Sequence, residues 1–258
     1  MPELPEVERA RSLIERLALN RTIAAVDDAD TYVCRPHAPG EIADALVGRE
    51  LVAVARRGKT MWCETSGDGP VLGLHLGMAG RIVVDGEEAG DPKPRVERPG
   101  WDRFTIRFED GGSLVLRDSR RLGRVRLEPD VERLGPDAAE VPRAQFRERV
   151  GRGGAPVKAR IMDQSVIAGV GNLLADEALW RARIDPRRPA GTLGEEELDR
   201  LRVEIRAATR SAIRHGGVHT GRVIAARRRG GVCPRCGAAM ERATIGGRTT
   251  WWCPAEQG

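Results

Sequence analysis

The apolar residues of this 258-residue chain change their spacing near Gly135 and Pro136, and this change constrains the fold most strongly. Upstream, after one helical stripe, apolar and polar residues alternate, which is the period of a half-buried β-strand. Downstream, apolar residues recur every three or four positions, which is the period of an amphipathic helix. We therefore expect an α+β protein in which a β-rich part precedes a helical part.

The upstream part begins with residues 5–19, whose apolar positions have helical spacing and whose Pro5 suits a first helical turn. Asp110-Gly111-Gly112 is typical of a β-hairpin turn. Residues 86–100 are polar, contain three prolines and predict a surface loop. The pattern predicts an N-terminal helix plus an antiparallel β-sandwich over residues 1–130, with strands at 50–55, 71–76, 81–85, 103–109 and 113–117.

The downstream part carries helical patterns at residues 143–150, 157–167, 171–183 and 195–215. Ahead of the helical pattern at 195–215, Thr192 and Glu195 have the spacing of a capping box. Gly216-Gly217 follows this pattern and is typical of a helix C-terminus. We expect a helical domain at 136–218, a short basic linker at 219–230 and a cysteine-containing hairpin at 231–258.

The net charge of +5 and the pI near 9.3 are compatible with a polyanionic partner without requiring one. Only Lys59, Lys93 and Lys158 are lysines among 43 cationic residues, so a retained lysine hints at a position that needs a compact ammonium group, although drift explains one such residue easily. No run of about 18 apolar residues occurs and the N-terminus has no apolar signal core. We expect a cytoplasmic protein with no membrane partner.

The cysteines near the C-terminus have metal-ligand spacing. Cys233-Pro-Arg-Cys236 forms a CxxC motif, and Cys253 follows after 16 residues. Such thiolates suit one structural zinc ion per chain, which a small hairpin needs for its stability. The fourth position of a four-cysteine site holds Glu256, whose carboxylate can bind zinc. Two alternatives remain open: zinc held with a water molecule, or reduced cysteines in a hairpin that Trp251 and Trp252 stabilise.

Two further motifs suit phosphate binding and nucleophilic chemistry. Gly169-Val-Gly-Asn172 lacks the preceding strand and third glycine of a dinucleotide site, but a helix starting at Gly171 would offer free backbone N–H groups to a phosphate, and Asn172 could add a donor. At the N-terminus, removal of Met1 would leave Pro2 as a secondary amine. An α-amino group titrates near 7.7–8.0, against about 10.4 for lysine, and therefore suits attack on a sugar carbon.

Seven motifs together resemble one family in their order along the chain: the formamidopyrimidine-DNA glycosylase / endonuclease VIII family. They are Met1-Pro-Glu-Leu-Pro-Glu-Val-Glu8, Arg57-Gly-Lys59, His75-Leu-Gly-Met78, Asp118-Ser-Arg-Arg-Leu-Gly123, Met162-Asp-Gln164, Gly169-Val-Gly-Asn-Leu-Leu-Ala-Asp-Glu177 and Cys233-Pro-Arg-Cys236. The resemblance covers the whole chain. It implies an N-terminal β-sandwich, a helix-two-turn-helix DNA-binding domain, a C-terminal zinc finger, and a monomer that acts on damaged double-stranded DNA in the bacterial nucleoid.

The resemblance also implies roles for single residues. Pro2 matches the nucleophile and Glu3 the general acid/base of the family. Lys59, which we group with the catalytic residues, and His75 match positions that hold phosphates beside the flipped nucleotide; a buried structural imidazole is the alternative for His75. The remaining matches are Lys158, which would face the damaged nucleotide or its phosphate, the phosphate-binding Asn172 and Arg248, and Glu177, which we expect to be structural.

A flipped base leaves a hole in the duplex that side chains must fill. The resemblance assigns this role to Met78, Arg120 and Leu122, where Leu122 replaces an aromatic residue usual in the family; ordinary core packing is the alternative for Met78. Residues 219–231 are also too short for the long lesion-capping loop of the members that bind 8-oxoguanine. Oxidised pyrimidines and abasic sites therefore become candidate substrates beside oxidised purines.

We therefore predict a bifunctional DNA glycosylase / AP lyase that excises oxidised bases and cleaves the strand by β-elimination, with δ-elimination left open, through an N-terminal proline iminium. The mechanism requires no redox cofactor and no catalytic metal. Two alternatives remain open: an enzyme that acts mainly as an abasic-site lyase with weak base excision, and a non-catalytic DNA-binding zinc-finger protein.

Overall fold

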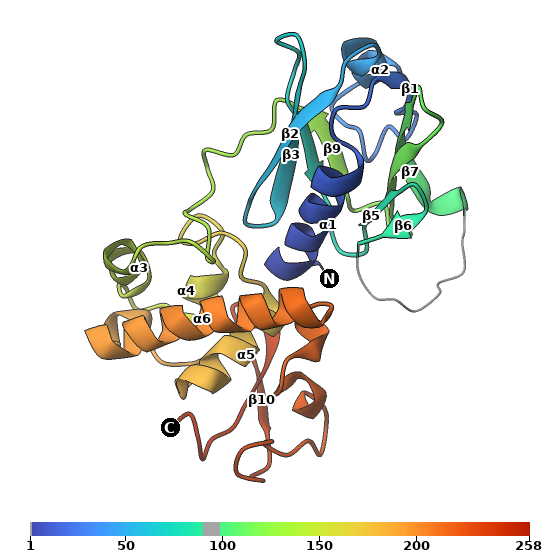
Figure 1. Ribbon diagram of the computed structural model, residues 1–258. Helices are drawn as coiled ribbons and strands as arrows, with labels where there is room; N and C mark the ends of the chain where they lie inside the picture. Colours follow the sequence, from blue (N-terminus) through green and yellow to red (C-terminus); the bar gives the residue numbers. More distant parts are fainter. Residues whose placement is uncertain (1, 90–98) are drawn as a thin grey trace. The chain divides into compact units, whose positions relative to one another are not determined.

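The computed structural model describes residues 2–89 and 99–258, which form two compact units (Figure 1). The first unit contains Pro2 and Glu6–Val131, and the second contains Glu3–Pro5 and Glu132–Gly258. Mixed helices and antiparallel sheets confirm the expected fold class. The domain limits at 130, 136, 218 and 231 stay a prediction, because the structure separates two units rather than three.

In the first unit, a five-stranded sheet has the order β1-β7-β8-β5-β6 and a four-stranded sheet the order β2-β3-β4-β9. All paired strands are antiparallel. Each of the five predicted strands is present. The elements are α1 (Leu4–Leu17), β1 (Ile23–Asp27), α2 (Glu41–Leu46), β2 (Leu51–Arg57), β3 (Thr60–Thr65), β4 (Leu72–His75), β5 (Arg81–Val84), β6 (Glu87–Glu88), the 3-10 helix η1 (Pro99–Trp101), β7 (Asp102–Phe108), β8 (Ser113–Arg117) and β9 (Arg124–Leu127).

Both sheets and helix α1 contribute to one apolar core. The helical stripe Val7, Ala10, Leu13 and Ile14 is buried there, as the spacing predicted. Phe104 from β7 belongs to the same core as side chains from the four-stranded sheet, so the two sheets pack face to face as a sandwich. The prediction of a surface loop at 86–100 is wrong at its start, because β6 pairs there with β5. Its residues 90–98 lie outside the described part of the chain.

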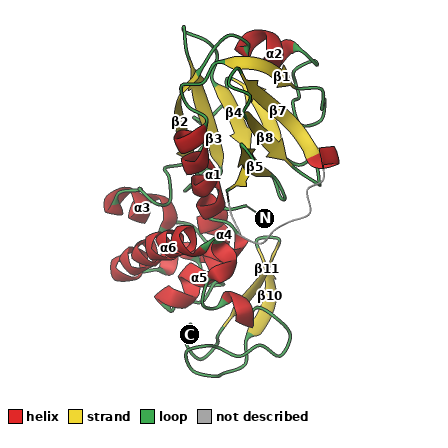
Figure 2. Ribbon diagram, turned by 45° about the vertical axis from the view of Figure 1, so that its right-hand side comes forward, coloured by secondary structure: helices red, strands yellow, loops and turns green. Residues whose placement is uncertain are grey.

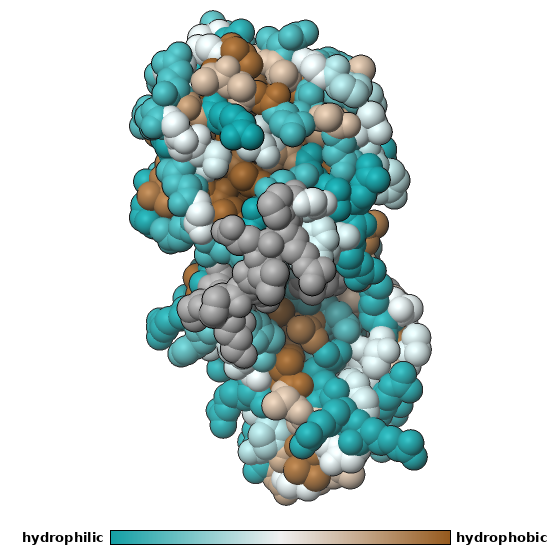
Figure 3. All heavy atoms as spheres, turned by 90° about the vertical axis from the view of Figure 1, so that its right-hand side faces the viewer, coloured by the Kyte–Doolittle hydropathy of each residue, from teal (hydrophilic) through white to brown (hydrophobic). Residues whose placement is uncertain are grey.

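The second unit is helical and ends in a β-hairpin (Figure 2). Helices α5 and α6 pack against each other and bury the predicted face of α6 in a second core. The elements are α3 (Arg143–Val150), α4 (Val157–Met162), α5 (Asn172–Ala182), η2 (Ala190–Thr192), α6 (Glu195–His215), η3 (Val218–Thr220), η4 (Ile224–Ala226), β10 (Glu241–Ile245) and β11 (Arg248–Trp252). Hydrophilic side chains cover much of the face shown in Figure 3, and no described helix is long and apolar enough to cross a membrane.

Helix α4 is shorter than predicted, because polar side chains turn the chain at its end. The Asp163 carboxylate accepts a hydrogen bond from the Ser165 N–H (2.9 Å). Gln164 donates to the carbonyl of Val170 (3.0 Å) and accepts from the N–H of Gly169 (3.0 Å). These bonds replace the helical ones that residues 163–167 would make.

The capping box at Thr192 and Glu195 is also wrong, because the N-cap of α6 is Gly194. The Glu197 carboxylate accepts a hydrogen bond from the Gly194 N–H (3.0 Å). The Thr192 hydroxyl donates instead to the Pro189 carbonyl (2.8 Å) within the preceding turn. Glu197 also pairs with Arg188, at 2.5 and 3.0 Å, which fixes the entry of α6.

We expect Glu197→Ala to lower the free energy of unfolding by about 1–2 kcal/mol, since it removes the cap and the ion pair. Glu196→Ala is the matched control, because exposed Glu196 shares the helix terminus without capping it. Arg188 lowers the pKa of Glu197, so the stabilisation is present at neutral pH and lost as acid protonates the carboxylate. Urea unfolding measures both variants; equal losses would attribute the effect to the helix dipole alone.

Candidate functional site

The Glu3 carboxylate lies at the N-terminus of α5. One of its oxygens accepts a hydrogen bond from the N–H of Leu173 (2.8 Å) and the other from the N–H of Leu174 (3.0 Å). The Leu4 N–H donates to the Gly169 carbonyl (3.2 Å) and holds the neighbouring backbone. A helix N-terminus favours a negative charge, and here the protein supplies that charge itself. The terminus predicted to clamp a phosphate thus holds Glu3 instead.

The glycines of the Gly-Val-Gly-Asn motif make room for this contact. A Cβ atom on Gly171 would lie 2.3 Å from the Glu3 carboxyl carbon, and one on Gly169 would lie 2.5 Å from a Leu4 methyl carbon. Gly169 also has φ +114°, which side chains rarely adopt. The opening motif and the Gly-Val-Gly-Asn motif therefore form one structural site, in which Pro2 directly precedes the fixed carboxylate.

Lys158 is fully buried, and its ammonium group has three protein partners. The Nζ atom lies 2.6 Å from Asp176 Oδ1, 2.7 Å from Asn172 Oδ1 and 2.7 Å from the Thr250 hydroxyl. Burial lowers the pKa of Lys158, and the Asp176 carboxylate opposes that shift. An ammonium group has three donors, so this geometry leaves none for a nucleotide. In this structure the Lys158 ammonium group contacts Asn172, and its role toward a damaged nucleotide stays a prediction.

The hairpin carries Arg248 at the start of β11. Its register joins Ile245 with Arg248, so residues 246–247 form a two-residue turn and Arg248 is exposed beside it. Asn172 Nδ2 donates to the Thr249 carbonyl (3.2 Å) next to Arg248. The Thr249 carbonyl thus connects the start of β11, next to Arg248, with Asn172 and its partner Lys158.

Lys59 and His75 are neighbours in the first unit. The register joins Arg57 with Thr60, which places Lys59 in the tight turn between β2 and β3, and it joins Thr60 with His75 on β4. Burial and the Lys59 charge lower the pKa of His75. The Gly77 N–H lies 3.0 Å from His75 Nδ1, which therefore accepts a hydrogen bond. A neutral His75 then carries its proton on Nε2 as a donor.

Asp118, a residue without a predicted role, organises the loop that carries Arg120 and Leu122. The buried Asp118 carboxylate accepts hydrogen bonds from the N–H groups of Arg120 (2.9 Å), Leu122 (2.8 Å) and Gly123 (2.7 Å). A Cβ atom on Gly77 would lie 2.3 Å from the Leu122 carbonyl, so the loops that carry Met78 and Leu122 touch closely. An aspartate that starts a polar turn motif is the signal that could have identified this anchor.

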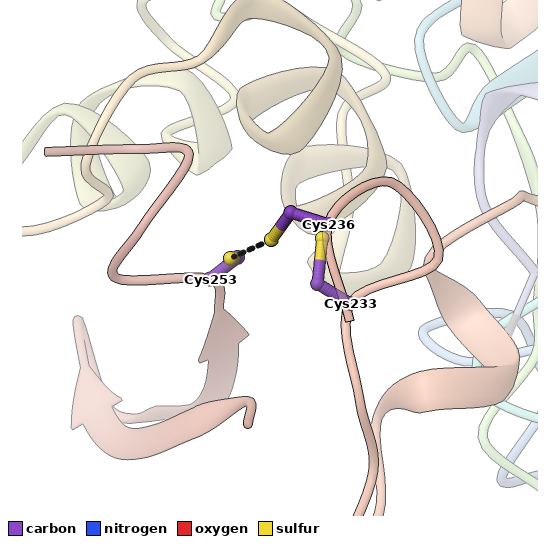
Figure 4. Close-up of side chains that lie close together, drawn as sticks. All are labelled: Cys233, Cys236 and Cys253. Carbon is purple, nitrogen blue, oxygen red and sulfur yellow. Dashed lines mark hydrogen bonds between the residues drawn. The ribbon is translucent and has the colours of Figure 1, made fainter. Parts of the chain in front are cut away.

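The three C-terminal cysteines form a compact sulfur group (Figure 4). Their Sγ atoms all lie within 4.8 Å of one another, and Cys236 is 3.5 Å from Cys253. Burial raises the pKa of Cys233, but hydrogen bonds from the Trp180 indole and the Arg235 N–H outweigh burial and bring it to about 7. Burial and the neighbouring thiols raise the pKa of Cys253 to about 11. Three converging sulfurs fit a tetrahedral metal ion such as zinc.

Glu256 does not join this group in the structure. Its Oε2 atom lies 2.9 Å from Arg235 Nη1 and 3.5 Å from Arg183 Nε. The next residue, buried Gln257, accepts from the Cys253 N–H (2.9 Å) and donates to the Ile184 carbonyl (2.9 Å). The C-terminal turn is thus held by Gln257 and by ion pairs, and the structure offers no support for Glu256 as the fourth ligand.

We expect Cys236→Ser to lose bound zinc in the presence of a chelator, because a structural site needs its thiolates. Glu256→Gln should retain zinc like the wild type, since Arg235 and Arg183 hold that carboxylate away from the sulfurs. Metal analysis after chelator treatment measures both variants. Faster zinc loss from Glu256→Gln than from Glu241→Gln, an exposed hairpin control, would restore Glu256 as a ligand.

Comparisons with known proteins agree with this geometry. The formamidopyrimidine-DNA glycosylase N-terminal domain model matches residues 1–125, and the H2TH domain model matches residues 134–222. The chain is 37% identical to formamidopyrimidine-DNA glycosylase of Chloroflexus aggregans over 98% of both proteins, and 34% identical to that of Paracoccus denitrificans over 98% of this chain and 99% of the relative. The solved Lactococcus lactis Fpg with abasic-site DNA has a TM-score of 0.84 at 26% identity over 100% of both chains. MutM with DNA containing carbocyclic 8-oxo-G has a TM-score of 0.83 at 27% identity over 99% of both chains. The chain belongs to the formamidopyrimidine-DNA glycosylase family.

Proposed function

We propose that this protein is a DNA glycosylase and AP lyase that excises oxidised bases from double-stranded DNA and then cuts the strand. The family assignment supports an enzyme of this class. Solved relatives with abasic-site, carbocyclic 8-oxo-G and Fapy-dG DNA support damaged duplexes as the partner. The observation that carries the proposal is the Glu3 carboxylate, held by the backbone of α5 directly after Pro2 in the chain.

In the proposed reaction, the neutral amine of Pro2 attacks the anomeric carbon of the damaged nucleotide. A C–N bond to Pro2 forms as the glycosidic bond breaks, and the base leaves with its electron pair and a proton. The Pro2 nitrogen loses its proton, and its electron pair then opens the sugar ring: the C1′–O4′ bond breaks, O4′ takes up a proton and an iminium forms. The iminium withdraws electrons from C2′, so a C2′–H proton is lost and the 3′ phosphate leaves with its electron pair by β-elimination. Glu3 is a suitable acid and base for these transfers, because two backbone N–H groups fix its position.

The remaining site residues would bind and shape the DNA. Lys59 and the Nε2–H of His75 suit the phosphates next to the flipped nucleotide, and Arg248 suits phosphates on the side of the hairpin. Exposed Met78 and Arg120, with Leu122, are proposed to fill the hole that base flipping leaves. Lys158 and Asn172 enter this scheme as a pair, in which the buried ammonium group orients the amide.

We propose one structural zinc ion per chain at Cys233, Cys236 and Cys253. Zinc bound there would stabilise the fold of the hairpin that presents Arg248, without taking part in the reaction. Its fourth ligand would be a water molecule or a group other than Glu256, whose carboxylate is engaged by two arginines.

One observation favours substrates other than oxidised purines. The segment after α6 is too short for a lesion-capping loop, and it is tied to α5: the Val223 N–H donates to Glu177 (2.9 Å) and Arg227 to Asp176 (2.7 Å). Together with the aliphatic Leu122, this supports oxidised pyrimidines or abasic sites, and an enzyme that is mainly an abasic-site lyase is the second candidate. Excision from duplexes containing single defined lesions decides between them.

We expect borohydride to trap a covalent complex between the wild-type protein and abasic-site DNA, because it reduces the iminium. Pro2→Gly, or a form that retains Met1, should lower trapping at least tenfold, since the secondary amine is lost. Lys59→Gln is the control for attack by a side chain, and peptide mapping of the complex locates the bond. A bond on Lys59 or Lys158, or no trapping by the wild type, would contradict the proposed nucleophile.

We expect Arg248→Ala to weaken binding similarly for all duplex sequences and to lower the salt dependence of log K by about 0.9, as for one lost phosphate contact. Arg242→Ala is the matched control, because Arg242 is an exposed arginine on the other strand of the same hairpin. Affinities measured at several salt concentrations test the pair. Equal slopes for Arg248→Ala and the wild type would remove Arg248 from the phosphate contacts.

A further inference from the structure

A cavity of about 560 Å³ lies in the first unit on the outer side of the four-stranded sheet. Its floor comes from neighbouring cross-strand rows: Thr60, His75 and Arg124 form one row across β3, β4 and β9, and Gly73 pairs with Arg126 in the next. Buried Leu74 and Val125 point to the opposite, core side. The alternation of side chains along β9 therefore directs both arginines outward into the same space.

The walls of this cavity are basic. Arg35, Arg124 and Arg126 line it against a single carboxylate, that of Asp130, so three positive charges face one negative charge. Elsewhere in this unit, arginines such as Arg21 and Arg117 pair with aspartates at 2.5–2.8 Å. Within residues 2–89 and 99–258, none of the three cavity arginines makes such a pair. Three positive charges that face one negative charge leave a net repulsion, so an anionic ligand would stabilise the arrangement.

Two of these guanidinium groups are held in place before any ligand binds. The Arg35 guanidinium lies 3.8 Å from the centroid of the Tyr32 ring, and Arg35 Nη1 donates to the Tyr32 carbonyl (2.6 Å). Arg124 lies 5.0 Å from the same ring and donates to the Gly123 carbonyl (2.6 Å). Stacking on an aromatic ring restricts the arginine and lowers the entropy that binding would cost.

The chemistry of the cavity selects its ligand. Arginine presents planar donors that match the oxygens of a phosphate, and His75 adds an Nε2–H donor at the floor. The volume falls in the range of about 300–1,000 Å³ that is typical of small-molecule sites, and is therefore large enough for a nucleotide. His75 also continues the cavity toward Lys59, whose proposed ligands are the phosphates beside the flipped nucleotide.

We propose that this cavity is a phosphate subsite that binds one nucleotide of the DNA flanking the lesion, through Arg35, Arg124 and Arg126. The inference rests on the proposed function, since it assumes that duplex DNA is the substrate, and it adds a contact beyond Lys59 and His75. A free mononucleotide presents the same phosphate chemistry and is the other source of the ligand.

The first experiment measures DNA affinity against salt concentration for the Arg124→Gln/Arg126→Gln double variant. We expect its slope of log K against log salt to fall by about 0.9, as for one lost phosphate. Arg107→Gln is the matched control, because Arg107 is exposed on β7 of the other sheet and should leave the slope unchanged. A slope equal to that of the wild type in the double variant would overturn the subsite.

The second experiment follows the His75 imidazole by NMR, which is practical because the chain has four histidines. Inorganic phosphate, a deoxynucleoside 5′-monophosphate and a lesion duplex are titrated separately. A shift of the His75 signal that the double variant loses supports the subsite; a response to the duplex alone assigns it to the DNA backbone, and tighter binding of the mononucleotide than of phosphate assigns a free nucleotide. No shift with any probe would overturn it.

The two proposals fail in different ways. Wild-type protein that binds duplex DNA and is trapped by borohydride, but keeps its salt slope in the double variant, would disprove the subsite alone. Wild-type protein that is never trapped, but whose His75 signal responds to phosphate through Arg124 and Arg126, would disprove the proposed reaction and retain the anion site.

Discussion

The contact between the Glu3 carboxylate and the first backbone N–H groups of α5 is the constraint on which the site depends. Burying a carboxylate is costly unless its oxygens are hydrogen-bonded, and here one N–H group binds each oxygen. The contact also dictates two glycines, because a side chain at residue 169 or 171 would collide with Leu4 or Glu3. The group that is proposed to transfer protons is thus positioned by backbone, which moves less than side chains do.

Lys158 is a second buried charged group that, like Glu3, connects segments distant in the sequence. The Lys158 ammonium group joins α4 to α5 through Asp176 and Asn172, and to β11 through Thr250. Removing one partner of such a group leaves a buried charge without compensation, so the set is retained as a whole. Lysine is rare in this chain, and its presence at position 158 fits that demand. One nitrogen atom with three donors reaches three oxygens around it, which a planar guanidinium group could not do.

Residue spacing predicted the elements that local sequence patterns determine. It missed features that depend on contacts between residues distant in the sequence. The period of apolar residues located α6 and five strands, whereas β1, β3, β6 and β9 of the first unit were missed; β9 has four residues, two of them arginines. The capping box failed because two glutamates, Glu195 and Glu197, compete for one helix start, and the Thr192 hydroxyl is used by the preceding turn. Glu3 meets α5 across 170 residues, and no local spacing predicts such a contact.

The same limit explains the two site residues that differ most from expectation. A motif can align Lys158 and Glu256 with functional positions. The side chains that pack around each charged group, however, determine which hydrogen bonds and ion pairs it makes. Lys158 is surrounded by acceptors from the protein, while Arg183 and Arg235 engage Glu256 outside the sulfur group. Arg124 and Arg126 show the converse: without a carboxylate to pair with, side chains that no motif identifies retain their charge for a ligand.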